Sequence, residues 1–255
     1  MRGGVAKTIP PFSVLVWRFC MQIDFLPLEK RLWEDGIAQI GFSDLHGLLP
    51  ERYAHLPYGV TLVFRLCSGV LDEVETRFEP TFTYFQHYRA VNAALDNAAL
   101  RTALFLERAG FLAMPVPASQ SVHDMGPYSG AFQHKTAAVR AGLGWIGKSA
   151  LFVSPQFGPR VRLCTVLTDC PLPGAQSAVP VSRCGGCSRC VDSCPACAIT
   201  GKEYSPGMAR CEIFDPEACS RHMKQAYLQI GRGAVCGICA AVCPFGKQPQ
   251  KENLL

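Results

Sequence analysis

The chain has 255 residues, of which 49% are hydrophobic and 18% are charged, and its formal net charge is +5. This length and hydrophobic content suit one large or two modest domains with a buried core, which excludes a disordered protein. The mild positive charge permits an anionic partner, but no basic and aromatic run indicates a dedicated nucleic-acid surface. No apolar stretch is long enough to cross a bilayer, so we expect a cytoplasmic protein with no membrane partner.

The first twenty residues are predicted to be a disordered extension. Residues 11–17 are mostly apolar and resemble the core of a signal peptide, but Arg18 interrupts the run and no small-residue cleavage site follows. We therefore expect Met21 to be the true start of the protein.

The N-terminal half is predicted to alternate between helices and strands. Apolar residues at three- and four-residue steps predict helices, and β-branched apolar runs predict strands. In chain order, these are a helix over Phe25–Ile40, a strand over Gly59–Cys67, a long helix over Pro80–Ala109 and a strand over Phe111–Val116. Gly41 and Gly110 are the expected helix stops. This alternation indicates an α/β layered fold.

A second group of elements leads into a linker. We expect a helix over Ser129–Arg140 and strands over Ala150–Pro155 and Val161–Thr168. Residues 169–181 are rich in Pro, Gly, Ser and Ala, which is typical of a linker. The sequence thus predicts an α/β (α+β) domain over residues 21–170 and a second domain over residues 171–255.

The second domain is dominated by cysteines, since ten of the 14 fall between Cys184 and Cys243. The first run, C-x2-C-x2-C-x3-C-P, begins at Cys184 and is the bacterial ferredoxin signature for an iron–sulfur cluster. The second run begins at Cys236 and ends in Cys-Pro, but it lacks one cysteine, which Cys211 or Cys219 can supply. The two runs together predict a ferredoxin-like domain with two 4Fe–4S clusters.

A disulfide scaffold and a zinc site both fit these cysteines less well than iron–sulfur clusters do. A disulfide scaffold would spread its cysteines along a short secreted chain. Zinc also binds CxxC pairs, but one zinc ion needs only four ligands, and the Cys-Pro endings are not part of that pattern.

The stretch Gly142–Ser149 satisfies the P-loop expression G-x4-G-K-[ST]. A P-loop needs a strand before its glycines and a helix after them, so that the helix N-terminus points at phosphate. Here a helix is predicted before the glycines and a strand after them. We therefore expect the glycines to allow a tight turn and close approach to a bulky ligand, not nucleotide hydrolysis.

The same stretch carries a resemblance to a known family. His134–Lys148, with Gly158–Leu163, Val166–Asp169 and the two cysteine runs, resembles the epoxyqueuosine reductase family over roughly residues 40–247. The resemblance implies a cobalamin on the N-terminal domain beside two 4Fe–4S clusters. The best-known members reduce the epoxide of a modified tRNA nucleoside to queuosine. The plan is also similar, more distantly, to corrinoid reductive dehalogenases.

The resemblance implies interleaved ligation of the two clusters. Three cysteines of the first run would share one cluster with the last cysteine of the second run, and the remaining ligands would hold the other cluster. For the eighth ligand, Asp215–Cys219 resembles the family's Asp-x3-Cys, which favours Cys219 over Cys211. The predicted metal ligands are Cys184, Cys187, Cys190, Cys194, Cys219, Cys236, Cys239 and Cys243.

The family's proton donor is an acidic residue ahead of the A-G-L-G turn, followed by a Glu-Arg pair. The matching positions here hold Tyr128 and then His134–Lys135, and Asp124 lies four residues too early. The candidate proton donors are Tyr128, His134 and Asp124. The candidate cofactor-binding residues are Gly142, Gly144, Gly147, Lys148 and His134.

These features predict an iron–sulfur oxidoreductase whose clusters relay electrons from a donor such as ferredoxin or flavodoxin to a cobalamin. Its substrate is undetermined. Queuosine-precursor tRNA is one candidate, although the chain ends at Leu255 without the tRNA-contacting extension of many members. The alternative is a non-catalytic 4Fe–4S electron carrier that serves a partner enzyme or a corrinoid protein. About 160 residues precede the cysteine domain, more than a mere carrier needs.

Overall fold

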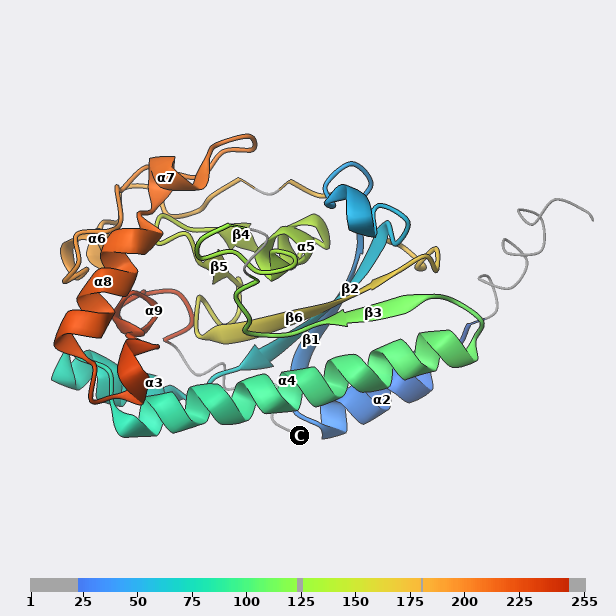
Figure 1. Cartoon of the computed structure of the whole chain (residues 1–255), viewed down its shortest axis with the longest axis horizontal. Helices are drawn as coiled ribbons and strands as arrows, with labels where there is room; N and C mark the ends of the chain where they lie inside the picture. Colours follow the sequence, from blue (N-terminus) through green and yellow to red (C-terminus); the bar gives the residue numbers. More distant parts are fainter. Residues whose placement is uncertain (1–22, 123–125, 180, 248–255) are drawn as a thin grey trace, which may run out of the picture.

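A computed structural model describes residues 23–122, 126–179 and 181–247. A four-stranded sheet lies between two groups of helices, and the cysteine region packs against one end of this body (Figure 1). Helices α2 (Leu26–Glu34) and α4 (Phe82–Arg108) cover one face of the sheet, and α5 (His134–Arg140) covers the other. The predicted extension over the first twenty residues and the candidate Asp124 lie outside the described residues.

The sheet is antiparallel throughout, with strand order β1-β2-β6-β3. Its central strands β2 and β6 are apolar along most of their length because helices bury both of their faces. The strands are β1 (Ile37–Asp44), β2 (Tyr58–Arg65), β3 (Ala113–Val116) and β6 (Val161–Thr168). The fold is therefore mixed α+β, and the regular α/β layering expected from the alternation of elements is not formed.

The first predicted helix is too long. Helix α2 ends at Glu34, and Gly36 turns the chain with a φ of +91°. Ile37 and Ile40 belong to β1, which pairs with β2 along its whole length. Gly41, the expected stop, lies within that strand, where an added Cβ would meet Ala141 at 2.8 Å. Pairing with a distant strand thus overrides the helical spacing of the two isoleucines.

The long central helix is confirmed as α4. Thr81 caps its N-terminus by accepting a hydrogen bond from the Tyr84 N–H at 3.0 Å. Gly110, with a φ of +91°, follows its C-terminus and donates its N–H to the carbonyl of Glu107 at 2.9 Å. A further helix, α3 (Ser68–Arg77), precedes it and is not predicted by the sequence pattern.

The remaining elements of the N-terminal region are short. Helix α5 begins at His134, five residues later than predicted, and a two-residue strand β4 (Trp145–Ile146) pairs with β5 (Phe152–Val153). The P-loop-like stretch thus forms the turn of a small hairpin with no helix after it, as expected. The buried Trp145 anchors this hairpin in the protein.

The cysteine region consists of short helices joined by loops. One hydrophobic core is continuous between the two regions, since Leu62 and Leu95 of the sheet layer belong to the same cluster as Ile238 and Ala241. The elements of the cysteine region are α6 (Arg189–Asp192), α7 (Arg210–Ile213), α8 (Pro216–Ala226), the 3-10 turn η3 (Gly231–Gly233) and α9 (Ile238–Ala241). Another 3-10 turn, η1 (Glu51–Tyr53), lies in the N-terminal region, between β1 and β2. None of the described helices combines the length and apolarity needed to cross a bilayer.

Candidate iron–sulfur and cofactor site

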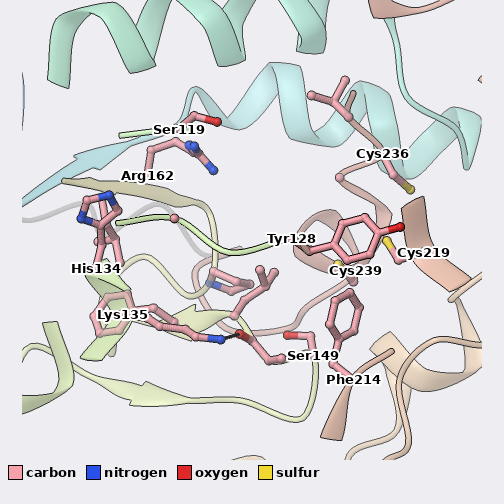
Figure 2. Close-up of a pocket in the computed structure, with 18 of the residues that line it drawn as sticks. Ser119, Tyr128, His134, Lys135, Ser149, Arg162, Phe214, Cys219, Cys236 and Cys239 are labelled. Carbon is pink, nitrogen blue, oxygen red and sulfur yellow. Dashed lines mark hydrogen bonds between the residues drawn. The ribbon is translucent and has the colours of Figure 1, made fainter. Parts of the chain in front are cut away.

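A cavity of about 610 Å³ lies where the sheet layer meets the cysteine region. Its walls come from the start of α4, residues 116–121 and 128–135, strand β6 and the cysteine segments (Figure 2). Cys194, Cys219, Cys236 and Cys239 all contribute to the lining. The cavity therefore connects the predicted cofactor domain directly to one set of predicted ligands.

The four cysteines at the cavity influence one another electrostatically. Burial, followed by the neighbouring thiols Cys219 and Cys194, raises the pKa of Cys236 to about 11. Burial and then the thiols of Cys236, Cys219 and Cys194 raise the pKa of Cys239 strongly. We call these four residues the inner set. No three of the described His, Cys, Asp or Glu side chains are placed to hold a metal ion as they stand. A positively charged metal group bound by the inner set would neutralise its thiolates.

A second group of four cysteines lies beyond the first. Burial, and then the thiols of Cys184, Cys190 and Cys187, raise the pKa of Cys243 to about 11. We call these four residues the outer set; unlike the inner set, they do not line the cavity. Cys190 also contributes to the raised pKa of Cys239, so the two sets are neighbours.

The remaining cysteines differ in their surroundings. Cys211 is exposed on α7, whereas Cys219 is partly buried on α8 with the inner set. Cys164 is buried in β6, where its thiol lies 3.5 Å from the carbonyl oxygen of Leu95. Cys170 is also buried, and Cys67 and Cys197 are exposed. Cys20 lies outside the described residues.

Tyr128 stands at the opening of the cavity and is 41% exposed. Its hydroxyl points toward the side on which Cys219 and Cys236 lie (Figure 2). Its backbone has a φ of +57°, a conformation that is strained for a tyrosine, and Arg210 donates a hydrogen bond to its carbonyl at 2.8 Å. A residue of the cysteine region thus fixes the backbone of Tyr128 at the cavity.

His134 also lines the cavity, but protein groups occupy both of its ring nitrogens. Its Nε2 lies 3.0 Å from the carbonyl of Pro117 and its Nδ1 lies 3.1 Å from the hydroxyl of Thr165. Because a carbonyl only accepts, Nε2 carries the proton and Nδ1 accepts from Thr165. Burial lowers the pKa of His134 to about 4. This geometry suits a positioning residue better than the proton donor expected from the sequence.

Lys135 is a cavity residue that the sequence pattern did not single out as a candidate. Its Nζ donates a hydrogen bond to the carbonyl of Ala150 at 3.1 Å (Figure 2). Burial, and then the charge of Arg210, lower its pKa to about 8. The sequence did offer one signal for Lys135: it stands at a position of the family's Glu-Arg pair, which follows the expected proton donor.

Arg162 of β6 places a second cation in the cavity wall. Its Nε donates to Asn92 at 3.0 Å, and its guanidinium lies 4.2 Å from the centre of the Tyr88 ring. Tyr88 in turn shares a hydrogen bond of 2.9 Å with Ser119. On α4, Tyr88 therefore lines the cavity, and Asn92 holds the guanidinium of Arg162 in its wall. The neighbouring Tyr84 is buried beside the inner set.

The predicted cofactor-binding glycines lie elsewhere. The described residues that line the cavity do not include Gly142, Gly144 or Gly147. A Cβ at Gly144 would lie 2.1 Å from the carbonyl oxygen of Val153, so this glycine permits backbone packing within the hairpin. Lys148 is likewise turned away from the cavity, and its Nζ donates to the carbonyls of Gly185 and Cys187. The glycine turn therefore packs protein against protein, contrary to the expectation of close approach to a ligand.

One polar atom in the cavity wall is unsatisfied. Nε2 of His222, on the same helix as Cys219, is buried with no hydrogen-bond partner among the described residues. A buried polar atom without a partner is costly unless a bound group satisfies it. Together with Arg162 and Lys135, this atom makes the cavity suitable for a polar, partly anionic cofactor.

Comparison with known proteins agrees with this arrangement. Residues 183–246 match the family model of a 4Fe-4S double cluster binding domain. The chain is 30% identical over 184 residues to the epoxyqueuosine reductase of Synechococcus sp., an alignment that covers 72% of this chain and 54% of the relative. It is 31% identical over 239 residues to the tetrachloroethene reductive dehalogenase of Dehalobacter restrictus, which covers 88% of this chain and 40% of the relative.

Solved structures share the fold. The catabolic reductive dehalogenase NpRdhA superposes with a TM-score of 0.65 at 18% identity, over 87% of this chain and 31% of that chain. Epoxyqueuosine reductase from Streptococcus thermophilus superposes with a TM-score of 0.52 at 19% identity, over 88% of this chain and 66% of that chain. At these identities the likeness concerns the fold alone.

The fold and the cysteine region define an iron–sulfur protein with a mixed α+β domain ahead of its 4Fe–4S binding domain. Within that class, the chain is similar to epoxyqueuosine reductases at about 30% identity, which confirms the resemblance seen in the sequence. Both of the relatives described above are reductive enzymes by name. The chain spans about half the length of the first of these curated relatives and less of the second.

Proposed function

We propose that the chain is an iron–sulfur oxidoreductase in which two 4Fe–4S clusters deliver electrons to a cobalamin held in the 610 Å³ cavity. One observation carries this proposal: the inner set of cysteines forms part of the cavity wall. A cluster held by this set would adjoin the cofactor, while a cluster in the neighbouring outer set would accept electrons from a donor such as ferredoxin or flavodoxin.

The proposed ligation is interleaved between the two cysteine runs. The outer set takes three ligands from the first run and Cys243 from the second, and the inner set takes Cys194 from the first run and Cys236 and Cys239 from the second. The electrostatic contacts of Cys219 with Cys194 and Cys236 support it as the eighth ligand in place of Cys211. Each cluster thus ties the two runs together.

The cavity residues would bind and orient the cofactor and the substrate. A cobalamin supplies low-valent cobalt for a difficult reductive step, while the protein supplies orientation and protons. Arg162, Lys135 and Nε2 of His222 are the groups that would hold its polar side chains. Tyr128 is the proton donor that we favour, since its hydroxyl is reachable at the cavity opening.

The substrate of this reaction is a reducible group not yet identified. The relatives named epoxyqueuosine reductase make queuosine-precursor tRNA one candidate. The alignment with tetrachloroethene reductive dehalogenases covers more of this chain, which makes an organohalide the second candidate. A tyrosine in place of the family's acidic donor separates this site from that of typical epoxyqueuosine reductases.

The cofactors are tested by anaerobic purification followed by iron, sulfide and corrinoid analysis. We expect about eight irons per chain and a shift of the cobalamin spectrum on binding. Purified protein that contains zinc in place of iron would contradict the proposal. Eight irons without corrinoid uptake would instead support the non-catalytic electron carrier.

Matched cysteine variants test the ligand assignment. Cys219→Ser should lose about half of the iron because it removes one ligand of the inner cluster. The Cys211→Ser protein should keep all of its iron, because Cys211 is an exposed cysteine on the neighbouring helix and is not a proposed ligand. Loss of iron from Cys211→Ser but not from Cys219→Ser would mean that Cys211 is the eighth ligand.

The role of Tyr128 is tested by Tyr128→Phe in the cofactor-loaded protein. Loss of a general acid should reduce turnover by about 10²- to 10⁴-fold while corrinoid binding stays unchanged. Assays with epoxyqueuosine-containing tRNA and with tetrachloroethene distinguish the two substrate candidates. Unchanged turnover in the variant would remove Tyr128 from the mechanism.

A further inference from the structure

The hairpin turn that matches the P-loop expression reaches the first cysteine run. Lys148 Nζ donates hydrogen bonds to the carbonyl oxygen of Gly185 at 2.6 Å and to that of Cys187 at 3.1 Å. These carbonyls belong to the loop between the first two cysteines of the outer set, 37 and 39 residues further along the chain. The lysine therefore fixes the backbone from which two proposed cluster ligands project.

Gly147 brings the same turn against a cysteine side chain. A Cβ added at this position would lie 3.4 Å from the Sγ of Cys184 and 2.9 Å from Cγ2 of Val153. The added Cβ would crowd Val153, whereas its distance to the Cys184 Sγ is an ordinary van der Waals contact, so the turn packs directly beside this cysteine. The glycine and the lysine of the motif thus face the outer set and not a phosphate.

In the part of the chain that the structure describes, Lys148 has no carboxylate partner. Among the ion pairs of the described residues, none includes Lys148, and its two acceptors are neutral carbonyls. Two carboxylates that interact with the cysteine region have other partners, since Asp192 accepts from Ser188 and Glu75 pairs with Arg160, Arg189 and Lys247. A partly buried, uncompensated ammonium acts on its neighbours with less screening than an exposed one.

We infer that Lys148 positions the outer cluster and raises its reduction potential. This inference rests on the proposal that the outer set holds a 4Fe–4S cluster. When such a cluster accepts one electron it gains one negative charge, and a fixed positive charge nearby stabilises the reduced form. Because the ammonium is bound to the loop of the outer set, its effect on the inner cluster is smaller. Lys148 thereby favours electron entry at the outer cluster.

The test is a redox titration followed by electron paramagnetic resonance on wild-type protein and three variants. Lys148→Met removes the charge, Lys148→Arg keeps it, and Lys202→Met removes an exposed lysine of the same region as a control. The Cys219→Ser protein, which should keep only the outer cluster, assigns the signals. We expect Lys148→Met to lower the midpoint potential of the outer cluster selectively, and Lys148→Arg and Lys202→Met to leave it close to the wild-type value.

Two outcomes would overturn the inference. One is a Lys148→Met protein with both clusters and unchanged potentials. If Lys148→Met loses the outer cluster, the titration is made on Lys148→Gln, which keeps a hydrogen-bond donor without the charge. An unchanged potential in that variant is the other overturning result. Failure of the proposed function is distinguishable, because wild-type protein would then lack the two clusters or hold them without binding corrinoid, and neither result depends on Lys148.

Discussion

His134 packs the segment after β3 against β6 through its two ring hydrogen bonds, to Pro117 and to Thr165. Burial lowers its pKa to about 4, so the ring stays neutral at physiological pH. Protonation would remove the acceptor that Thr165 requires. The residue therefore stabilises one wall of the cavity in its neutral form, and this has a consequence for stability in acid.

The pH dependence of stability should report this neutral histidine. The pKa rises from about 4 in the folded chain to about 6.5 when unfolded, so the unfolded state binds the proton first as pH falls. Stability is therefore lost between about pH 6.5 and pH 4. Between pH 7 and pH 5, wild type should lose about 2 kcal/mol more than His134→Gln. Denaturant unfolding at both pH values measures this, and equal losses would contradict the neutral, buried ring.

Lys135 shows the same effect of burial on a cation. Its pKa of about 8 keeps it largely protonated near pH 7, with a smaller preference for the charged form than an exposed lysine has. A cation held near its pKa in the same cavity as Tyr128 is well suited to assist proton movement there. Spacing alone did not single it out, because a lysine in an amphipathic segment is usually solvated.

At the scale of elements, α4 links the two functional regions. Tyr84 and Tyr88 near its start border the cavity, and Leu95 in its middle belongs to the main core. Further along, Asp96 accepts a hydrogen bond from the N–H of Ala118 at 2.8 Å. One regular helix thus positions the aromatic wall of the cavity and the segment opposite it.

The N-terminal cap of α4 should be measurable in stability. Thr81 accepts from the N–H of Tyr84 and donates its hydroxyl to Glu73 of α3 at 3.0 Å. Thr81→Ala should destabilise the protein by about 1 kcal/mol because the helix loses its cap. Thr81→Ser, which keeps the hydroxyl, should lose much less. Chemical denaturation of the three proteins measures the difference, and equal stability of all three would contradict the capping role.

Local sequence predicts the elements best where one segment decides its own structure. The period of α4, the Gly110 stop and the apolar strand β6 are properties of short stretches, and all three are confirmed. The first predicted helix extends wrongly into β1 because Ile37 and Ile40 keep a helical spacing by coincidence. Their strand conformation comes from pairing with β2.

At the scale of the whole molecule, the sheet layer and the cysteine region form one packed unit. Arg160 is buried, ion-paired with Asp72 at 2.7 Å, and donates a hydrogen bond to the carbonyl of Ala241 at 3.0 Å. An arginine at the start of a strand gives no sign of such burial in the sequence. Its contacts join β6, α3 and α9 next to Cys243.

Two glycines mark the closest approach of the regions. A Cβ at Gly158 would lie 2.0 Å from the carbonyl oxygen of Phe245, which follows the ligand Cys243 and Pro244, and one at Gly246 would lie 2.0 Å from the carbonyl oxygen of Phe157. Gly158→Ala should therefore displace the last cysteine segment and destabilise the protein by about 3 kcal/mol or more.

Gly174→Ala is the matched control for this prediction. Gly174 has a φ of +64°, close to the +59° of Gly158, but nothing lies within 4 Å of an added Cβ. It should lose only about 1 kcal/mol, from the backbone conformation. Thermal unfolding and the iron content of the two variants measure the difference. Equal effects would mean that backbone strain, and not the contact with Phe245, decides the stability.

The sequence by itself determined the cysteine pattern and the resemblance to epoxyqueuosine reductases. Cysteines three residues apart in a loop bring several ligands of one cluster together within a short segment, so their spacing alone indicates a cluster. The antiparallel sheet, the cavity and the partners of its side chains were decided only by the tertiary structure. Strand β2 pairs with the distant β6, and Lys148 binds a loop 37 residues away. Such contacts depend on which distant segments meet, and no local pattern records that choice.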